Sequence, residues 1–220
     1  MNDYKNCMDL NKNMVEGQIK PLGKISPSVL EAFLSIPRDQ FVPSKLKNLA
    51  YLEKNLELDN DRFLLKPSLI AKIISIAEFE PSDTVLIIGS STGYSSAILS
   101  NIAETVISIE ENDALVNFSE SAVLNKKIDN VVFLKKDLNE GCPEHGPFNK
   151  ILIEGAVEEI PKYLFDQLDE NGKMIAIISN GDLSEVREYN KVEQNIGSKF
   201  LFSCEAPKLK AFNKSDSFNF

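Results

Sequence analysis

A short Gly/Ser loop is the first part of the sequence whose residue types suggest binding chemistry. The apolar run Val85–Ile88 leads into Gly89-Ser90-Ser91-Thr92-Gly93, and a helical pattern follows the loop. Glycines allow a tight turn and a close backbone approach to a ligand, while the start of a helix offers free N–H groups. The loop lacks the middle glycine of a dinucleotide fingerprint, and no Lys-Ser/Thr pair follows it as in a P-loop. The sequence therefore predicts a nucleotide-like ligand that is held without either of those motifs.

Acidic residues follow the next two predicted strands. Glu110 ends the run Thr105–Ile109, and a carboxylate at this place can accept hydrogen bonds from both hydroxyls of a ribose. Asp137 follows the run Val131–Leu134 and is placed to receive an adenine amino group. Parallel strands bring their carboxyl ends to one edge of a sheet. The loop, Glu110 and Asp137 together therefore predict a pocket for an adenosine that carries no pyrophosphate.

The elements that position these groups are predicted from Thr84 onward. Short β-branched runs alternate there with amphipathic segments, and such βαβ units imply a parallel sheet covered on both faces. One helical segment begins at Pro161, includes Leu168 and ends at Asn171–Gly172. The predicted fold class is α/β, a doubly wound and mostly parallel sheet. The predicted buried strands are Thr84–Ile88, Thr105–Ile109, Val131–Leu134, Lys150–Ile153 and Lys173–Ile178.

The two ends of the chain show different patterns. Helices are predicted to begin at Ser26-Pro27 and at Pro67, so residues 1–80 are expected to form a helical cap within the same domain. Residues 81–212 are expected to form the ligand-binding core. The segment from Val186 to Cys204 alternates as two further strands would, which predicts an antiparallel pair at one edge of the sheet. Residues 213–220 are expected to form a loose polar tail.

Composition limits the classes of function. The 220 residues carry a formal charge of −9 without a basic cluster, which disfavours nucleic-acid phosphates but is compatible with a cationic ligand. Neither a secretory signal nor an apolar run of membrane length is visible, so a cytoplasmic protein without membrane contact is expected. The three cysteines, Cys7, Cys142 and Cys204, are widely separated. Their spacing predicts neither a disulfide framework nor a metal site.

The order of several motifs resembles that of S-adenosylmethionine-dependent methyltransferases with a Rossmann-like fold. These motifs are GSSTGY, ISIEEN, VVFLKKD, FNKILIEGAVEEIP and NGKMIAII. More narrowly, MVEGQI, IPRDQFVP, AYLEKNLEL and KPSLIAKII are similar to the protein-L-isoaspartate O-methyltransferase family, and the similarity extends from Met14 to Lys208. It implies the cofactor S-adenosyl-L-methionine and methyl esterification of isoaspartyl carboxylates in damaged protein or peptide substrates. With this resemblance, the predicted cofactor-binding residues are Gly89, Ser90, Ser91, Gly93, Tyr94, Glu110, Glu111, Asp137 and Leu138.

Three positions depart from the pattern of that family. Leu65 stands where the family has the serine of the acceptor site, Ile87 replaces an acidic residue of the first strand, and Glu154 replaces a threonine after the fourth strand. Methyl transfer to an ionised carboxylate needs placement more than proton chemistry, so a catalytic histidine is not required. A carboxylate at Glu154 stabilises a sulfonium but repels an acceptor carboxylate. Glu154 is therefore the candidate catalytic residue, as proton acceptor for a neutral amine or hydroxyl, or else it caps a helix or binds the cofactor.

Two functions remain open on the sequence alone. The chain is a methyltransferase that acts on isoaspartyl groups or on a changed acceptor, or it is a catalytically weak or inactive descendant that binds S-adenosylmethionine as a sensor or scaffold. The methyltransferase is the predicted function, and Leu65 and Ile87 are the residues that support the alternative. Cofactor binding followed by turnover separates the two. A nucleic-acid methyltransferase is disfavoured by the charge and by the absence of an Asn/Asp-Pro-Pro-aromatic motif after the fourth strand.

Overall fold

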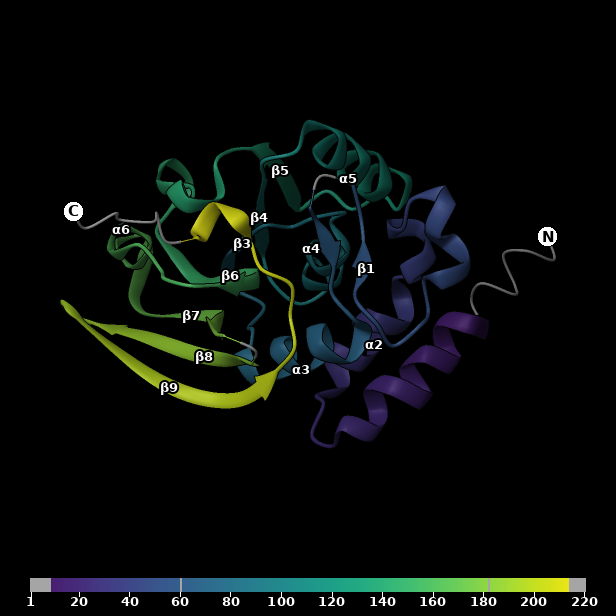
Figure 1. Cartoon of the computed structure of the whole chain (residues 1–220), viewed down its shortest axis with the longest axis horizontal. Coiled ribbons are helices and arrows are strands. Elements are labelled where there is room, and N and C mark those ends of the chain that lie inside the picture. Colours follow the sequence, from purple (N-terminus) through teal and green to yellow (C-terminus); the bar gives the residue numbers. More distant parts are fainter. Residues whose placement is uncertain (1–8, 60, 182, 214–220) are drawn as a thin grey trace.

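A seven-stranded sheet forms the centre of the molecule (Figure 1). The computed structural model describes residues 9–59, 61–181 and 183–213. The strands lie in the order β5-β4-β3-β6-β7-β8-β9; β5 to β7 are parallel, and β7, β8 and β9 pair antiparallel. The predicted doubly wound sheet with an antiparallel edge is thereby confirmed. The strands are β3 (Thr84–Ile88), β4 (Thr105–Glu110), β5 (Val131–Lys135), β6 (Phe148–Val157), β7 (Leu168–Asn180), β8 (Leu183–Val192) and β9 (Asn195–Cys204).

Two apolar layers cover the faces of this sheet. Successive residues of a strand point to opposite faces, so Val85 and Ile87 join one buried cluster, and Leu86 and Ile88 join the other. The helices beside the sheet include α2 (Pro27–Ser35), α3 (Pro67–Ala77), α4 (Tyr94–Leu99), α5 (Asp113–Asn125) and α6 (Lys162–Asp166). Side chains of α2, α3, α4 and α5 belong to the first cluster, and Leu164 of α6 belongs to the second.

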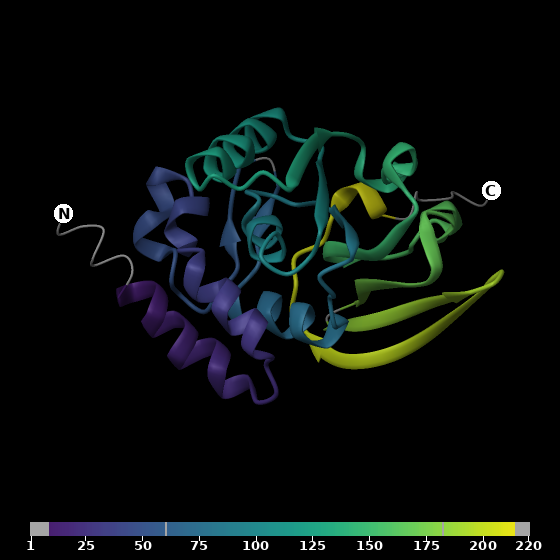
Figure 2. The same cartoon turned by 180° about the vertical axis from the view of Figure 1, so that it is seen from behind.

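The first part of the chain is helical, as predicted, but it also contains a small sheet. Residues 9–14 are helical and continue into the π-helical turn Val15–Ile19. The predicted start of α2 is confirmed, because the Ser26 hydroxyl accepts a hydrogen bond from the Val29 N–H at 3.3 Å. The sequence did not predict β1 (Leu56–Glu57) and β2 (Phe63–Leu64), which pair antiparallel. Figures 1 and 2 show the first helix at one side of the molecule and the free end of the β8–β9 ribbon at the other. The boundary at residue 80 stays a prediction.

The helix predicted from Pro161 to Asn171–Gly172 is shorter than expected. It ends at Asp166, and Leu168 instead begins strand β7 and pairs with Phe148. Gln167 explains the difference, because its backbone and its side chain are both held by other segments. Its carbonyl accepts from the Phe148 N–H at 2.8 Å, and its side chain bonds to the backbone at Glu140 and Cys142. Because of these contacts, the chain enters β7 at Leu168, and the helix ends about one turn before its predicted end.

The segment after β9 returns to the sheet. Figure 1 shows it crossing from the end of β9 toward β3. The Ala156 N–H donates to the Pro207 carbonyl and the Leu209 N–H to the Ala156 carbonyl, both at 2.8 Å, so this segment lies along the end of β6. Phe212 is buried in the last turn. Cys7 and residues 214–220 of the predicted tail lie outside the described residues. Among the described helices, none combines the length and the apolar character needed to cross a bilayer.

Candidate active site

The strand order reverses between β3 and β6, and this defines where a ligand is expected. Strands β4 and β5 lie on one side of β3, whereas β6 and β7 lie on the other. In open α/β sheets, ligands bind outside the carboxyl ends of the strands at such a point. Gly89 follows the end of β3, and Glu154 and Gly155 lie near the end of β6. The crevice expected from this rule therefore lies between the Gly/Ser loop and Glu154.

The loop after β3 has the tight geometry that its glycines predict. Gly89, Ser91 and Gly93 have φ values of 80°, 55° and 78°, in the left-handed region. A Cβ atom at Gly93 would lie 2.7 Å from Cζ of Phe133, so only glycine fits there. The N–H groups of Gly89 and Ser90 both donate to the Ile109 carbonyl, at 3.0 and 3.1 Å, which fixes the loop against β4.

Three hydroxyl groups of this loop are buried without a hydrogen-bond partner. They belong to Ser90, Ser91 and Thr92, whose exposed fractions are 1%, 1% and 0%. Buried polar atoms in native proteins are almost always paired, and an unpaired group often marks the place of a ligand or water. Three adjacent unpaired hydroxyls on a loop at the switch point fit a polar ligand such as the predicted cofactor.

Glu110 is buried at the end of β4, but its carboxylate is already paired. Oε2 accepts from Nη2 of Arg62 at 2.7 Å and from the Ser91 N–H at 2.9 Å. Oε1 accepts from Nε of Arg62 at 3.0 Å and from the Glu111 N–H at 3.1 Å. Both Arg62 and Glu110 are almost completely buried. Glu110 lies at the end of the strand, as predicted, but the sequence did not predict this ion pair, which joins residues 48 positions apart.

The other predicted adenosine contacts lie along the ends of β4 and β5. Glu111 and Asp137 are exposed, and they share a surface hollow of about 500 Å³ with Glu140 and His145. Glu111 also lines a second hollow, of about 480 Å³, next to Arg62. Leu138 is fully buried in the second apolar cluster. Both hollows are thus lined by Glu111, one of the predicted contacts, and Leu138 belongs to the packed layer at this edge.

Two side chains from distant parts of the chain cover the crevice. Nη2 of Arg62 lies 3.0 Å, and Cδ1 of Leu209 lies 3.3 Å, from the place of a Cβ atom at Gly89. Cγ of Leu209 lies only 2.5 Å from the corresponding place at Gly155, so Leu209 occupies the space that a side chain would need there. The sequence did not single out Leu209. The sequence feature that could have indicated its position is Gly155. A glycine near the end of a buried strand often marks the close approach of another segment.

Glu154 is buried in this crevice and is only half paired. Its exposed fraction is 6%; the Ser95 hydroxyl donates to Oε1 at 2.7 Å, while Oε2 has no hydrogen-bond partner. Burial raises the pKa of this carboxyl group to about 7, although the Ser95 hydrogen bond and the positive charges of Arg62 and Arg38 lower it in part. Glu154 therefore changes its charge near neutral pH, a property typical of residues at functional sites.

Arg38 is a residue of the site that the sequence reasoning missed. It is fully buried and donates to the carbonyls of Ala50 and Leu65, at 2.8 and 2.7 Å, while Nη1 has no partner. Burial lowers its pKa to about 10, and the charges of Tyr94 and Glu154 are among the influences that oppose this shift. Its signal lay in the segment IPRDQFVP, where the polar stretch Arg38-Asp39-Gln40 lies between Ile36-Pro37 and Phe41-Val42-Pro43.

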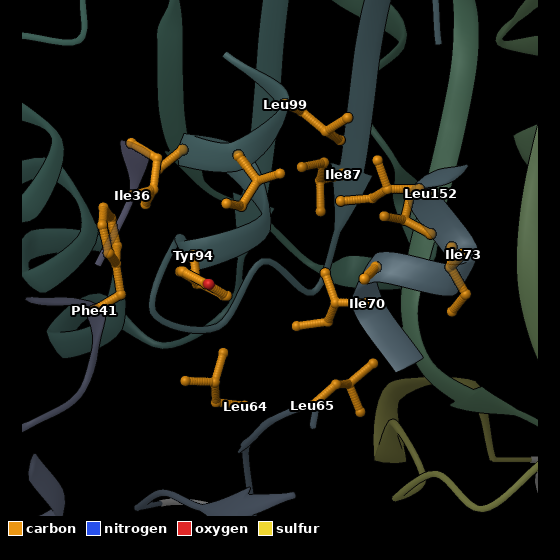
Figure 3. Packing of buried hydrophobic residues seen from close by; sticks show 14 of the residues in the cluster. Ile36, Phe41, Leu64, Leu65, Ile70, Ile73, Ile87, Tyr94, Leu99 and Leu152 are labelled. Atoms are coloured by element: carbon orange, nitrogen blue, oxygen red, sulfur yellow. The ribbon is translucent and has the colours of Figure 1, made fainter. Parts of the chain in front are cut away.

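Tyr94, a predicted cofactor contact, faces the apolar side of the crevice. The Arg38 guanidinium lies 5.0 Å from its ring centroid, within cation–π range. Its hydroxyl is buried without a partner, and burial raises its pKa. Figure 3 shows Tyr94 with Phe41 on one side, Ile70 on the other and Leu64 below it.

Two of the departures noted in the sequence, Leu65 and Ile87, are buried in the first apolar cluster. Their exposed fractions are 1% and 0%. The wall where the family has its serine is therefore apolar in this chain.

One group of possible metal ligands lies beside the surface hollow. Ligand atoms of Cys142, Glu144 and His145 lie within 4.8 Å of one another. Lys136 forms an ion pair with Glu144, and burial raises the pKa of the Cys142 thiol to about 11. Glu144 is thus already paired with a lysine, and both Glu144 and His145 are exposed.

Strand order, the loop at the switch point and the carboxylate at the end of β4 together define the class of Rossmann-like methyltransferases. A family model described as protein-L-isoaspartate(D-aspartate) O-methyltransferase matches residues 9–204, which is most of the chain. The chain belongs to the protein-L-isoaspartate O-methyltransferase family.

Relatives and solved structures agree with this assignment. A protein-L-isoaspartate O-methyltransferase of Methanospirillum hungatei is 33% identical over 175 residues, 80% of this chain and 81% of the relative. One of Helicobacter pylori is 31% identical over 198 residues, 89% and 90% of the two chains. A solved protein-L-isoaspartate O-methyltransferase is 25% identical with a TM-score of 0.80; the match covers 90% of this chain and 65% of that one. A Plasmodium falciparum structure of the same name, in complex with S-adenosyl-L-homocysteine, has the same fold at 23% identity and a TM-score of 0.74, over 93% and 98% of the two chains.

Proposed function

We propose that this chain uses S-adenosyl-L-methionine to methylate isoaspartyl carboxylates of damaged proteins or peptides, as part of protein repair in the cytoplasm. The observation that carries the proposal is the row of buried, unpaired hydroxyls of Ser90, Ser91 and Thr92 on the loop at the switch point. Membership of the methyltransferase family supports the same chemistry and does not favour a non-catalytic sensor or scaffold.

The cofactor would be held by groups on both sides of β3. The loop from Gly89 to Gly93 offers hydroxyl groups and close backbone approach, and Glu110 is the carboxylate for the ribose hydroxyls. Asp137 would receive the adenine amino group, with Glu111 and Leu138 beside it, and Tyr94 borders the loop. When bound, S-adenosylmethionine supplies an electrophilic methyl group on a positively charged sulfur. The residues of the chain therefore need only place and desolvate an acceptor.

Glu154 is proposed to select the acceptor through its own charge. Its Oε2 atom is free of protein partners, while Ser95 holds Oε1. With a pKa of about 7, Glu154 is neutral in half of the molecules at that pH. A neutral Glu154 can donate a hydrogen bond from Oε2 to an acceptor carboxylate, which is the contact that a serine at position 65 would provide. An ionised Glu154 repels the same carboxylate and favours a neutral acceptor, whose proton it can accept.

The test is a methylation assay with two peptides that differ only in carrying an isoaspartyl or an aspartyl residue. We expect labelled methyl groups from S-adenosylmethionine to appear as base-labile esters on the isoaspartyl peptide alone. Because the acceptor is ionised throughout, kcat/KM should fall as the pH rises through about 7 and Glu154 ionises. The variant Glu154→Gln keeps a donor at this place and should remove the fall. A rate that rises above pH 7 would indicate a neutral acceptor, and no labelling of either peptide would contradict the proposal.

A further inference from the structure

The ion pair between Arg62 and Glu110 occupies atoms that the proposed function requires. A carboxylate offers about four lone-pair positions for hydrogen bonds. In Glu110, the Arg62 fork and the N–H groups of Ser91 and Glu111 take up both oxygens, and the Asn112 N–H adds a further contact at 3.3 Å. No acceptor position of Glu110 is then left for two ribose hydroxyls. This inference rests on the proposed function, because it concerns the same cofactor site.

Arg62 also occupies space that a ligand would need. Its Nη2 atom lies 3.0 Å from the place of a Cβ atom at Gly89, over the backbone that the glycine leaves open. Its side chain is only 4% exposed, so it is packed into the site rather than resting at the rim. The ligand that Glu110 would hold and the Arg62 guanidinium therefore compete for the same oxygens and for the same volume.

We propose that Arg62 is an internal competitor of the cofactor ribose, and that the resting site is closed by the Arg62–Glu110 ion pair. An adenosine-containing ligand binds only to molecules in which Arg62 has left Glu110. The apparent affinity is then the intrinsic affinity reduced by the fraction of open molecules. The pair thus sets the concentration at which the cofactor binds to the enzyme. While the site is closed, the charge of Arg62 balances that of Glu110.

The first test measures the binding of adenosine and of S-adenosylhomocysteine by calorimetry. The variant Arg62→Gln removes the competing charge and should bind both ligands at least about tenfold more tightly than the wild-type chain, as expected when a mostly closed site becomes open. Arg62→Lys keeps the charge without the bidentate fork and should lie between the two. Lys45→Met is the matched control, because it also removes one positive charge from an ion pair. Lys45 is exposed and pairs at 2.6 Å with Asp59, which lies three residues before Arg62. Equal or weaker binding by Arg62→Gln would overturn the proposal.

The second test uses the wild-type chain and does not depend on how a variant folds. The chain has three arginines, Arg38, Arg62 and Arg187. Phenylglyoxal modifies accessible guanidinium groups, so Arg62 should be protected in the free protein and should become several-fold more reactive when adenosine is saturating. Arg187 is half-buried and far along the chain on β8, and its reactivity should not change. Peptide mass spectrometry separates the three sites. Arg62 that stays protected, or becomes better protected, would show that it lines the bound ligand and does not compete with it.

The two proposals fail in different ways. If adenosine binds more tightly to Arg62→Gln but the isoaspartyl peptide is not methylated, the competition stands and the proposed function fails. If the peptide is methylated while Arg62→Gln binds no more tightly than the wild type, the function stands and the competition fails. If neither form binds adenosine, both fail.

Discussion

The two sides of the crevice are equally buried but differ in chemical character. On the proposed cofactor side, the loop from Gly89 to Gly93 and Glu110 supply hydroxyls, N–H groups and a carboxylate. On the proposed acceptor side, Leu65 belongs to an apolar wall, and the carboxyl group of Glu154 has a pKa of about 7. The polar groups of the first side are held by the fold, whereas the second side combines an apolar residue at the place of the family's serine with a group whose charge depends on pH. One sheet therefore presents two sides of different chemistry.

The largest effect should follow from removing the anchor of the cofactor side. Glu110→Ala leaves the Arg62 guanidinium buried without its partner, and breaking a buried ion pair in this way costs about 3–5 kcal/mol of unfolding free energy. Adenosine binding should be lost as well. Urea unfolding measures the first effect, and calorimetry measures the second. Glu111→Ala is the matched control, because this neighbour is exposed and its loss should change stability by less than about 0.5 kcal/mol. If Glu110→Ala lowered the free energy of unfolding by less than about 1 kcal/mol, it would hardly differ from the Glu111→Ala control, and the prediction would be wrong.

On the acceptor side, replacing the buried carboxyl group of Glu154 should raise the free energy of unfolding, and only at higher pH. The pKa of Glu154 is raised from 4.5 to about 7, so between these values the native chain holds a proton that the unfolded chain has released. Stability contributed by this group therefore falls as the pH rises from about 4.5 to 7, and it stays low above 7. The shift corresponds to about 3 kcal/mol. Glu154→Gln should thus stabilise the protein by up to about 3 kcal/mol at pH 8 and by almost nothing at pH 4.5.

Thermal or urea unfolding over this pH range checks the prediction. Ser95→Ala is the companion variant, because it removes the hydroxyl that bonds to Oε1 and should raise the pKa of Glu154 further. A stability difference between Glu154→Gln and the wild type that does not vary with pH would show that Glu154 does not titrate in this range.

The smallest effect should come from restoring a hydroxyl to the apolar wall. Leu65→Ser places a donor at the position where the family has its serine, and one new hydrogen bond to the acceptor should raise kcat/KM for an isoaspartyl peptide by about tenfold. The chain loses stability in this variant because Leu65 is 1% exposed. Leu64→Ser is the matched control, since Leu64 is equally buried and next in the sequence. It should lose similar stability without a gain in rate. An equal effect of both substitutions on kcat/KM would show that position 65 has no special relation to the acceptor.

Local pattern was enough to predict the sheet and the position of the loop. The β-branched run Thr84–Ile88 is a strand with the predicted bounds, and the Gly/Ser spacing after it gave the turn. The end of α6 was not predictable in this way, because the side chain of Gln167 bonds to residues 25 and 27 positions earlier in the chain. The partner of Arg62 and the place of Leu209 were not predictable for a similar reason. The importance of both residues depends on which residues they meet across the crevice, and periodicity carries no information on such pairs.

The place of Leu209 makes the crevice depend on a segment outside the sheet. The seven strands of the described sheet all precede Leu209 in the chain, yet Leu209 and its neighbours complete the crevice by packing on Gly155 and bonding to Ala156. Strand pairing therefore does not by itself complete the crevice, because this wall is added by a segment that follows every strand of the sheet.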